Sequence, residues 1–155
     1  MRQGIDAIRA TGVLLWTPYY LALLASAHRR LGQPKEGLVA VTEALDLAAR
    51  TGERFWEAAL MHLKGQLLLQ ADAANQPEAD ACFHRAIEIA RAQEAKSWEL
   101  RAATSLARLS RDQSNSDEAR ELLVPIYDWF TEGFETADLR EARVLLDDLS
   151  GRQVA

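Results

Sequence analysis

Apolar residues recur along this chain every three or four positions, which is the spacing of one face of an α-helix. The segments that show this spacing are rich in Ala, Leu, Arg, Glu and Gln, which favour helices, and no segment alternates apolar and polar residues long enough to form a strand. The 8 glycines and 4 prolines mark the ends of these segments. The pattern predicts an all-α fold with about eight helices, at residues 2–11, 17–31, 34–50, 54–71, 76–93, 97–113, 116–130 and 138–149.

Three of the predicted helices begin with the same polar pattern, in which an amide residue precedes a glutamate by three positions: Gln33 and Glu36, Asn75 and Glu78, Asn115 and Glu118. This is the spacing of a capping box, in which the first side chain accepts a hydrogen bond from a backbone N–H of the first helical turn. Pro34 suits the first turn, where its missing N–H removes no helical hydrogen bond.

The predicted helices also repeat with a period of about 40 residues. The small residues Ala25, Gly65 and Ala107 align, and a tryptophan (Trp16, Trp56 or Trp98) precedes each of them at the same distance. The second helix of each repeat gives three more aligned columns: Gly37, Ala79 and Ala119; Val41, Phe83 and Leu123; Ala44, Ala86 and Ile126. Small residues allow two antiparallel helices to approach closely, so the columns predict stacked helical hairpins, in which each hairpin contacts its neighbours.

These columns resemble those of the tetratricopeptide repeat (TPR), and the turn Gly32-Gln33-Pro34-Lys35-Glu36-Gly37 is the most similar single segment. The unit is longer than the usual repeat of about 34 residues, Gly37 stands where alanine is usual, and Pro125 interrupts the last second helix. The resemblance implies a TPR-like α-α superhelix, a solenoid of antiparallel hairpins. It also implies a single repeat domain over residues 1–155, with a remnant second helix at 1–12, three repeats at 13–51, 52–94 and 95–134, and a capping helix at 135–150.

A second resemblance covers nearly the whole chain. The segments at 51–58, 63–69, 102–109 and 129–134 are similar to the C-terminal repeat region of large bacterial signalling proteins. In those proteins an adenylate/guanylate-cyclase-like or DNA-binding domain and a STAND-type ATPase module precede TPR-like helices. The resemblance implies that this chain is the C-terminal arm of such a protein, excised from its effector domains, and that it acts in bacterial signal transduction.

Composition narrows the function classes further. The 155 residues include 18 Lys+Arg and 23 Asp+Glu, for a net charge of −5, which disfavours a general nucleic-acid or membrane-surface binder. The longest apolar stretches fall far short of the ~20 residues that a membrane span needs. The single cysteine, Cys82, cannot form an internal disulfide, and we expect it to be a small apolar core residue. The composition thus favours a cytoplasmic protein.

The sequence contains no catalytic signature. A G-x-x-x-x-G-K-[ST] phosphate loop is absent, so nucleotide binding by that route is excluded. His28, His62 and His84 lack metal-ligand spacing, and we expect packed or capping roles for them. We therefore expect no enzyme activity, no cofactor and no bound metal.

The first helices of the repeats supply the candidate binding face, on the inner side of the predicted solenoid. Its residues are Tyr19, Ala22, Ser26, Arg29, Arg30, Ala59, His62, Gln66, Gln70, Arg101, Thr104, Arg108 and Arg111. Arginine is frequent and acidic residues are absent there, although the chain is acidic, which predicts a groove for an acidic peptide, a carboxylate or a phosphate. The alternative is a solvated helix face whose arginines pair with neighbouring acidic residues, such as Asp112. The groove interpretation also places the acidic residues of the chain outside, away from the arginines.

The aligned tryptophans have two interpretations as well. They could form a binding stripe, but their fixed position in the repeat favours packing between repeats. Trp129, Phe130 and Phe134 are expected to seal the last repeat under the capping helix.

The predicted function is a protein–protein interaction or sensor module that binds a peptide or a neighbouring domain on its concave face. An alternative is self-association, because the first predicted helix carries Ile5 and Ile8, and Val13 follows it, with no preceding hairpin to cover them. Such an apolar surface favours a homodimer.

Overall fold

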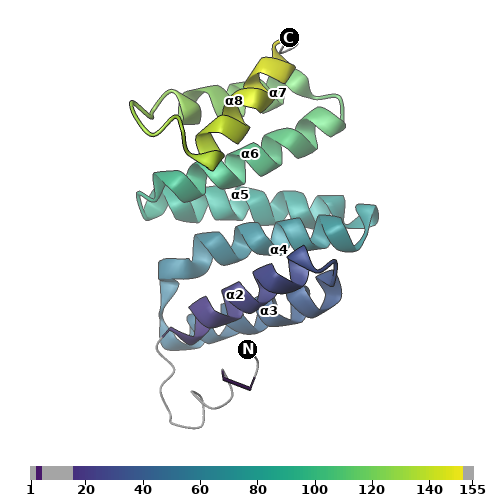
Figure 1. Cartoon of the computed structure of the whole chain (residues 1–155), viewed down its shortest axis with the longest axis vertical. Coiled ribbons are helices and arrows are strands. Elements are labelled where there is room, and N and C mark those ends of the chain that lie inside the picture. Colours follow the sequence, from purple (N-terminus) through teal and green to yellow (C-terminus); the bar gives the residue numbers. More distant parts are fainter. Residues whose placement is uncertain (1–2, 5–15, 152–155) are drawn as a thin grey trace. The chain divides into compact units, whose positions relative to one another are not determined.

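In the computed structural model, which describes residues 3–4 and 16–151, every regular element of the described chain is helical (Figure 1). The elements are α2 (Thr17–Arg30), α3 (Pro34–Thr51), the 3-10 turn η1 (Arg54–Trp56), α4 (Glu57–Ala71), the 3-10 turn η2 (Ala73–Asn75), α5 (Gln76–Ala92), α6 (Lys96–Asp112), α7 (Ser116–Tyr127) and α8 (Ala137–Leu149). The chain divides into two compact units, unit 1 (1–82) and unit 2 (83–155), whose boundary falls within α5.

The predicted all-α class is confirmed, but the described residues form seven α-helices where the sequence predicts about eight. The predicted helix at 2–11 lies outside the described residues, apart from 3–4, which are helical. The segment at 54–71 begins as a 3-10 turn, and α7 ends at Tyr127, three residues earlier than predicted. Pro125 lies inside this helix, where it has no N–H to donate to the carbonyl of Glu121.

The core of unit 1 lies between α2, α3 and α4, whose facing residues Leu21, Ala25, Val41, Leu60 and Leu67 are fully or almost fully buried. Gly37 brings α3 close to both neighbouring helices. A Cβ at this position would lie 2.5 Å from Leu67 Cδ2 and 3.3 Å from the Ala25 carbonyl oxygen. A larger residue at this position would therefore have to displace the Leu67 side chain.

The core of unit 2 includes buried residues of α6, α7 and α8, among them Ala107, Leu123 and Ala142. All members of the aligned small and bulky columns are buried in their own units. The repeat pattern in the sequence thus corresponds to core positions.

The predicted capping boxes are wrong at Gln33 and Asn115, neither of which makes a side-chain hydrogen bond to its helix start. Gln33 Oε1 instead lies 2.8 Å from His28 Nδ1, and Asn75 Nδ2 donates to the Leu68 carbonyl at 3.1 Å. Gln33 and Asn75 thus bond to groups at the end of the preceding helix.

Three described helices end in the same hydrogen-bonded turn: α2 in unit 1, and α5 and α6 in unit 2. After α2, the Gly32 N–H donates to the Arg29 carbonyl and the Gln33 N–H to the His28 carbonyl. After α6, Ser114 and Asn115 make the equivalent bonds to Arg111 and Ser110. This is the Schellman arrangement, which needs a left-handed residue. Gly32 has φ 69° and Ser114 has φ 68°.

Candidate functional site

In unit 1 the predicted binding residues lie on α2 and α4. Gln70 Nε2 donates to the Arg29 carbonyl at 3.0 Å, so one of the predicted ligand-binding side chains joins the two helices. His62 is buried, Tyr19 and Gln66 are half-buried, and Arg30 is exposed. Unit 1 therefore brings Arg29 and Gln70 together, whereas His62 belongs to the interior.

Arg29 and Arg30 end α2, where positive side chains interact favourably with the negative end of the helix dipole. Arg29 Nε is buried and has no hydrogen-bond partner among the described residues. A buried donor without an acceptor is unfavourable. An acceptor brought to this end of α2 from outside would satisfy it.

Aromatic side chains form a cluster in unit 1, at the start of α2 and around η1. The Trp56 ring centroid lies 4.7 Å from that of Tyr19, 4.8 Å from that of Phe55 and 6.4 Å from that of Trp16. Packing between the first two aligned tryptophans is thereby confirmed. Trp16 and Phe55 nevertheless remain 52% and 71% exposed. The tryptophans were identified from their aligned positions in the sequence, whereas the place of Phe55 in this cluster was not predicted.

In unit 2, all three predicted arginines of α6 form ion pairs with α8. Arg101 Nε lies 2.7 Å from Asp138 Oδ2, Arg108 Nη2 2.7 Å from Glu141 Oε1, and Arg111 Nη1 2.8 Å from Asp148 Oδ2. The pairs follow the same order along both helices, so α8 runs parallel to α6 (Figure 1). We call Arg101, Arg108 and Arg111 the arginine row.

The arginine row is thus already paired within the chain. Arg111 also contacts Asp112 at 2.8 Å, and its hydrogen bonds to Asp112 and Asp148 raise the pKa of the guanidinium above its ordinary value. For these three residues the pairing interpretation describes the observed state. The expectation that acidic residues lie away from the arginines is wrong for α8.

The acidic partners on α8 were not among the predicted site residues. Asp138, Glu141 and Asp148 lie beside the buried Leu139, Ala142 and Leu145 on the same helix. Their helical spacing along the flank of an apolar face is the signal that could have identified them.

A second ionic contact in unit 2 involves the carboxylate of Glu99, which is buried near the start of α6. Arg91 Nε donates to Glu99 Oε1 at 2.7 Å and Lys96 Nζ to Oε2 at 2.8 Å. Burial raises the pKa of Glu99, but the hydrogen bonds from Arg91 and Lys96 outweigh it, and the pKa lies below its ordinary value. The group is therefore ionised at neutral pH and fixes the turn between α5 and α6.

The aromatic residues of unit 2 are used differently from those of unit 1. The Arg101 guanidinium lies 4.5 Å from the Trp98 ring centroid, and Lys96 Nζ lies 5.5 Å from that of Trp129. Trp129 is 57% exposed, so it does not seal the last repeat as expected, although the Phe134 ring packs 5.9 Å from that of Tyr127.

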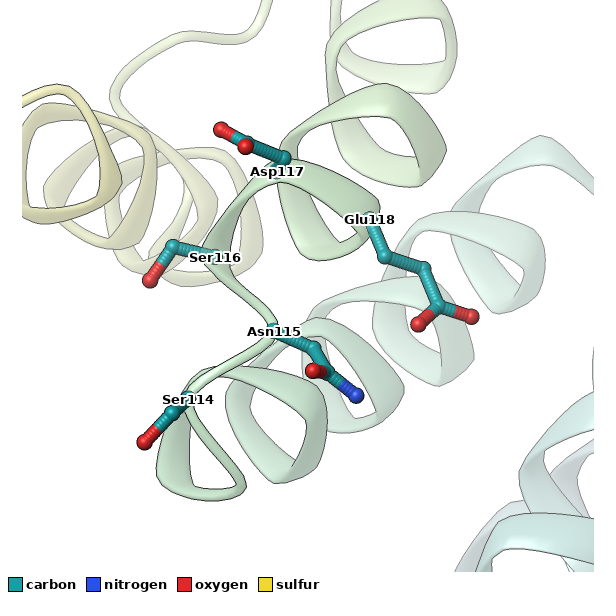
Figure 2. Close-up of a pocket in the computed structure, with 5 residues that line it drawn as sticks. All are labelled: Ser114, Asn115, Ser116, Asp117 and Glu118. Carbon is teal, nitrogen blue, oxygen red and sulfur yellow. The ribbon is translucent and has the colours of Figure 1, made fainter.

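A hollow of about 370 Å³ lies at the turn between α6 and α7 and is lined by the consecutive residues 114–118 (Figure 2). Figure 2 shows the five side chains pointing in different directions, with Asp117 and Glu118 on different sides of the helix start. Because no set of side chains converges on a point and the two carboxylates disfavour anions, the hollow does not define a ligand site.

The described residues include no group of three or more His, Cys, Asp or Glu side chains that could hold a metal ion. Cys82 is buried, as expected, and burial raises the pKa of its thiol. Among the helices described, none has the length and apolar character needed to cross a membrane.

No family model, curated protein or solved structure matches the chain.

Proposed function

We propose that the chain is a protein-interaction module of a larger bacterial signalling or regulatory protein in the cytoplasm. Its hairpins would form part of a TPR-like solenoid and bind a peptide or a neighbouring domain through the inner face of the first helices. The observation that carries this proposal is that α6 holds an acidic helix, α8, through three arginine–carboxylate pairs. Arginine forks suit such recognition because they bind carboxylates with defined geometry.

Among its described residues, unit 1 has a comparable face on which Arg29 Nε has no hydrogen-bond partner. Arg29 and Arg111 occupy the same position in their repeats, as the equivalent turns after α2 and α6 demonstrate. Arg111 contacts two carboxylates, whereas Arg29 Nε has no acceptor among the described residues. A carboxylate from a partner would supply at Arg29 Nε what Asp112 supplies at Arg111 Nε.

Binding accounts for these residues better than catalysis does. The charged groups of the candidate face are arginines, and the carboxylates next to them in unit 2 are held in ion pairs. In the larger protein implied by the resemblance, binding at this arm would regulate an attached ATPase or cyclase-like domain.

The test uses fluorescence anisotropy with labelled amphipathic peptides that carry Asp or Glu at helical spacing. We expect the chain to bind them, and to bind peptides of the same apolar sequence with Lys in those places at least tenfold more weakly. Substituting Arg29→Glu and Arg30→Glu should reduce the affinity for the acidic peptides at least tenfold.

The exposed Arg50, at the other end of the same unit on α3, provides the matched control. Arg50→Glu reverses one arginine, half the charge change of the double variant, and should leave binding within about twofold; each of Arg29→Glu and Arg30→Glu alone is compared with it. Reversing Arg108 and Arg111 is a less direct test, because it also breaks the contacts with α8. Equal binding of acidic and basic peptides would refute the proposed function.

Self-association is a second candidate function, and the aromatic cluster of unit 1 favours it. Trp16, Tyr20 and Phe55 combine ring contacts with substantial exposure, and Trp16 lies five residues after the end of the predicted helix at 2–11. Ile5, Ile8 and Val13 lie outside the described residues. Light scattering over a concentration series should detect a dimer that Phe55→Ser weakens and that Val39→Ser, at another exposed apolar residue of unit 1, does not.

A further inference from the structure

We propose that α8 is an intramolecular stand-in for the ligand of the arginine row, and that a partner binds α6 by presenting an acidic amphipathic helix in place of α8. The inference rests on the proposed function, and it adds the chemistry of the partner and a way of controlling access to the site. A free chain would be closed at this face, and a competing helix would open it.

The side chains of α8 define the chemistry of that partner. The carboxylates Asp138, Glu141 and Asp148 bind the arginine row. The apolar ridge beside them is buried: Leu139 is 3%, Ala142 0% and Leu145 3% exposed. The ligand is therefore a helix with carboxylates along one edge of a narrow apolar stripe, and a short acidic strand or a phosphate group alone would lack the stripe.

The contact between α6 and α8 can be exchanged. The arginine side chains remain 35–41% exposed, so water and salt reach the ion pairs and screen them. The opposite side of α8 includes the exposed Arg140, Arg143 and Val144. Displacing α8 requires the release of its buried face, which packs against α7 as well as α6.

The segment between α7 and α8 acts as the tether. It spans residues 128–136, lies outside the α-helices, and is exposed from Thr131 to Thr136. A flexible chain of this length has a root-mean-square span of roughly 15–18 Å. The tether then holds α8 near α6 at an effective concentration on the order of millimolar. A separate helix of the same sequence at micromolar concentration should not displace it, whereas weakening the ion pairs of α8 should admit the competitor.

The test uses the full chain and a fluorescein-labelled peptide with the sequence of residues 136–150. In the variant with Asp138→Lys, Glu141→Lys and Asp148→Lys, we expect the peptide to bind at least tenfold more tightly than it binds the wild-type chain. Amide hydrogen exchange in α8 should become at least tenfold faster in the same variant. A peptide that carries the three lysines should not bind it.

A charge-swapped chain provides the matched control. Adding Arg101→Glu, Arg108→Glu and Arg111→Glu to the lysine variant restores the three pairs with the signs exchanged. We expect α8 to regain its protection and the acidic peptide to bind no more tightly than it binds the wild-type chain. Circular dichroism checks that each variant is folded, and the neutral set Asp138→Asn, Glu141→Gln and Asp148→Asn replaces the lysine set if that variant is unfolded.

Faster exchange of α8 without any gain in peptide binding would overturn the inference. It would also fail if the acidic peptide bound the charge-swapped chain as tightly as the lysine variant. Peptide binding that depends on Arg29 and Arg30 but ignores the charges of α8 would overturn this inference alone and leave the proposed function in place.

Discussion

The two units join non-consecutive helices by different chemistry. Between α2 and α4, rings and an amide make the contact, with Tyr19 packed against Trp56 and Gln70 bonded to the Arg29 carbonyl. Between α6 and α8, three arginine–carboxylate pairs flank a narrow apolar stripe. The aligned columns beneath are buried in both units, so the difference lies in the side chains that surround a shared core pattern.

The aromatic contact of unit 1 should resist changes of solvent, whereas the ion pairs of unit 2 should respond to them. Aromatic packing is insensitive to salt and to pH near neutrality, whereas partly exposed ion pairs weaken as ionic strength rises. We therefore expect unit 1 to be the constant part of the chain and the end of unit 2 to be its adjustable part.

The largest effect should come from removing the centre of the aromatic contact. Trp56 touches three other rings, so Trp56→Ala should lower the stability of unit 1 by about 2–3 kcal/mol, independently of salt. Trp98→Ala, at the same repeat position in unit 2, removes a stack on Arg101 and should cost less. Hydrogen exchange in each unit measures both. A larger loss for Trp98→Ala would contradict the comparison.

Glu99→Gln should give the next largest effect, because it removes a buried charge that two cations hold. We expect unit 2 to lose about 2 kcal/mol at neutral pH. Because the pKa of Glu99 is lowered in the folded protein, its contribution is present above the ordinary value of 4.5 and is lost as the pH falls through the lower folded value. The variant should therefore lose less stability than the wild type between pH 5 and about pH 3.

Urea unfolding at several pH values, followed with exchange in unit 2, checks that prediction. Glu57→Gln is the matched control, because Glu57 holds the same repeat position in unit 1 and is only half-buried. Equal losses of stability for the two variants would show that the ion pairs of Glu99 add nothing to the stability of unit 2.

Gly37→Ala tests the tight packing of unit 1. Alanine normally stabilises a helix relative to glycine, by roughly 0.5–1 kcal/mol. Here the new Cβ would collide with Leu67, so we expect a net loss of about 1–2 kcal/mol, measured by urea unfolding. An increase in stability would mean that Leu67 moves aside easily and that the close approach is not a constraint.

The smallest effect should come from the turns that the two units share. Ser114→Gly relieves a left-handed serine and should stabilise unit 2 by about 0.5–1 kcal/mol, whereas Gly32→Ser should destabilise unit 1 by about 1 kcal/mol. Thermal unfolding of the two single variants gives both signs. Changes of the same sign would indicate that something other than backbone conformation determines the residue at this position.

The helices and the core columns were predictable from the sequence because they depend on local spacing. Small residues such as Ala25 and Ala119 indicate directly where one helix packs closely against another. The pairing at the candidate face was not predictable in this way. Asp138 and Asp148 each lie 37 residues along the chain from the arginine that they bind. Only the packing of α8 against α6 brings the paired side chains together.

Local competition explains the wrong capping boxes. Gln33 and Asn75 have side chains that can serve either of two helix ends, and the spacing to the next glutamate does not reveal which end offers the better partner. In the structure His28 and the Leu68 carbonyl are those partners. The exposed part of the aromatic cluster was not predicted either. Phe55 lies in a 3-10 turn where the sequence predicts the start of a helix, and its side chain is exposed there.

The buried Cys82 has a consequence for chemical reactivity. It is the only cysteine of the chain, it is 4% exposed, and the raised pKa of its thiol keeps the reactive thiolate scarce. A thiol reagent can modify it only when the surrounding helices separate. The rate at which a reagent labels Cys82 therefore reports how often the helices around it separate, and no engineered cysteine is needed. A change of this rate on addition of a partner would show that binding alters the opening of these helices.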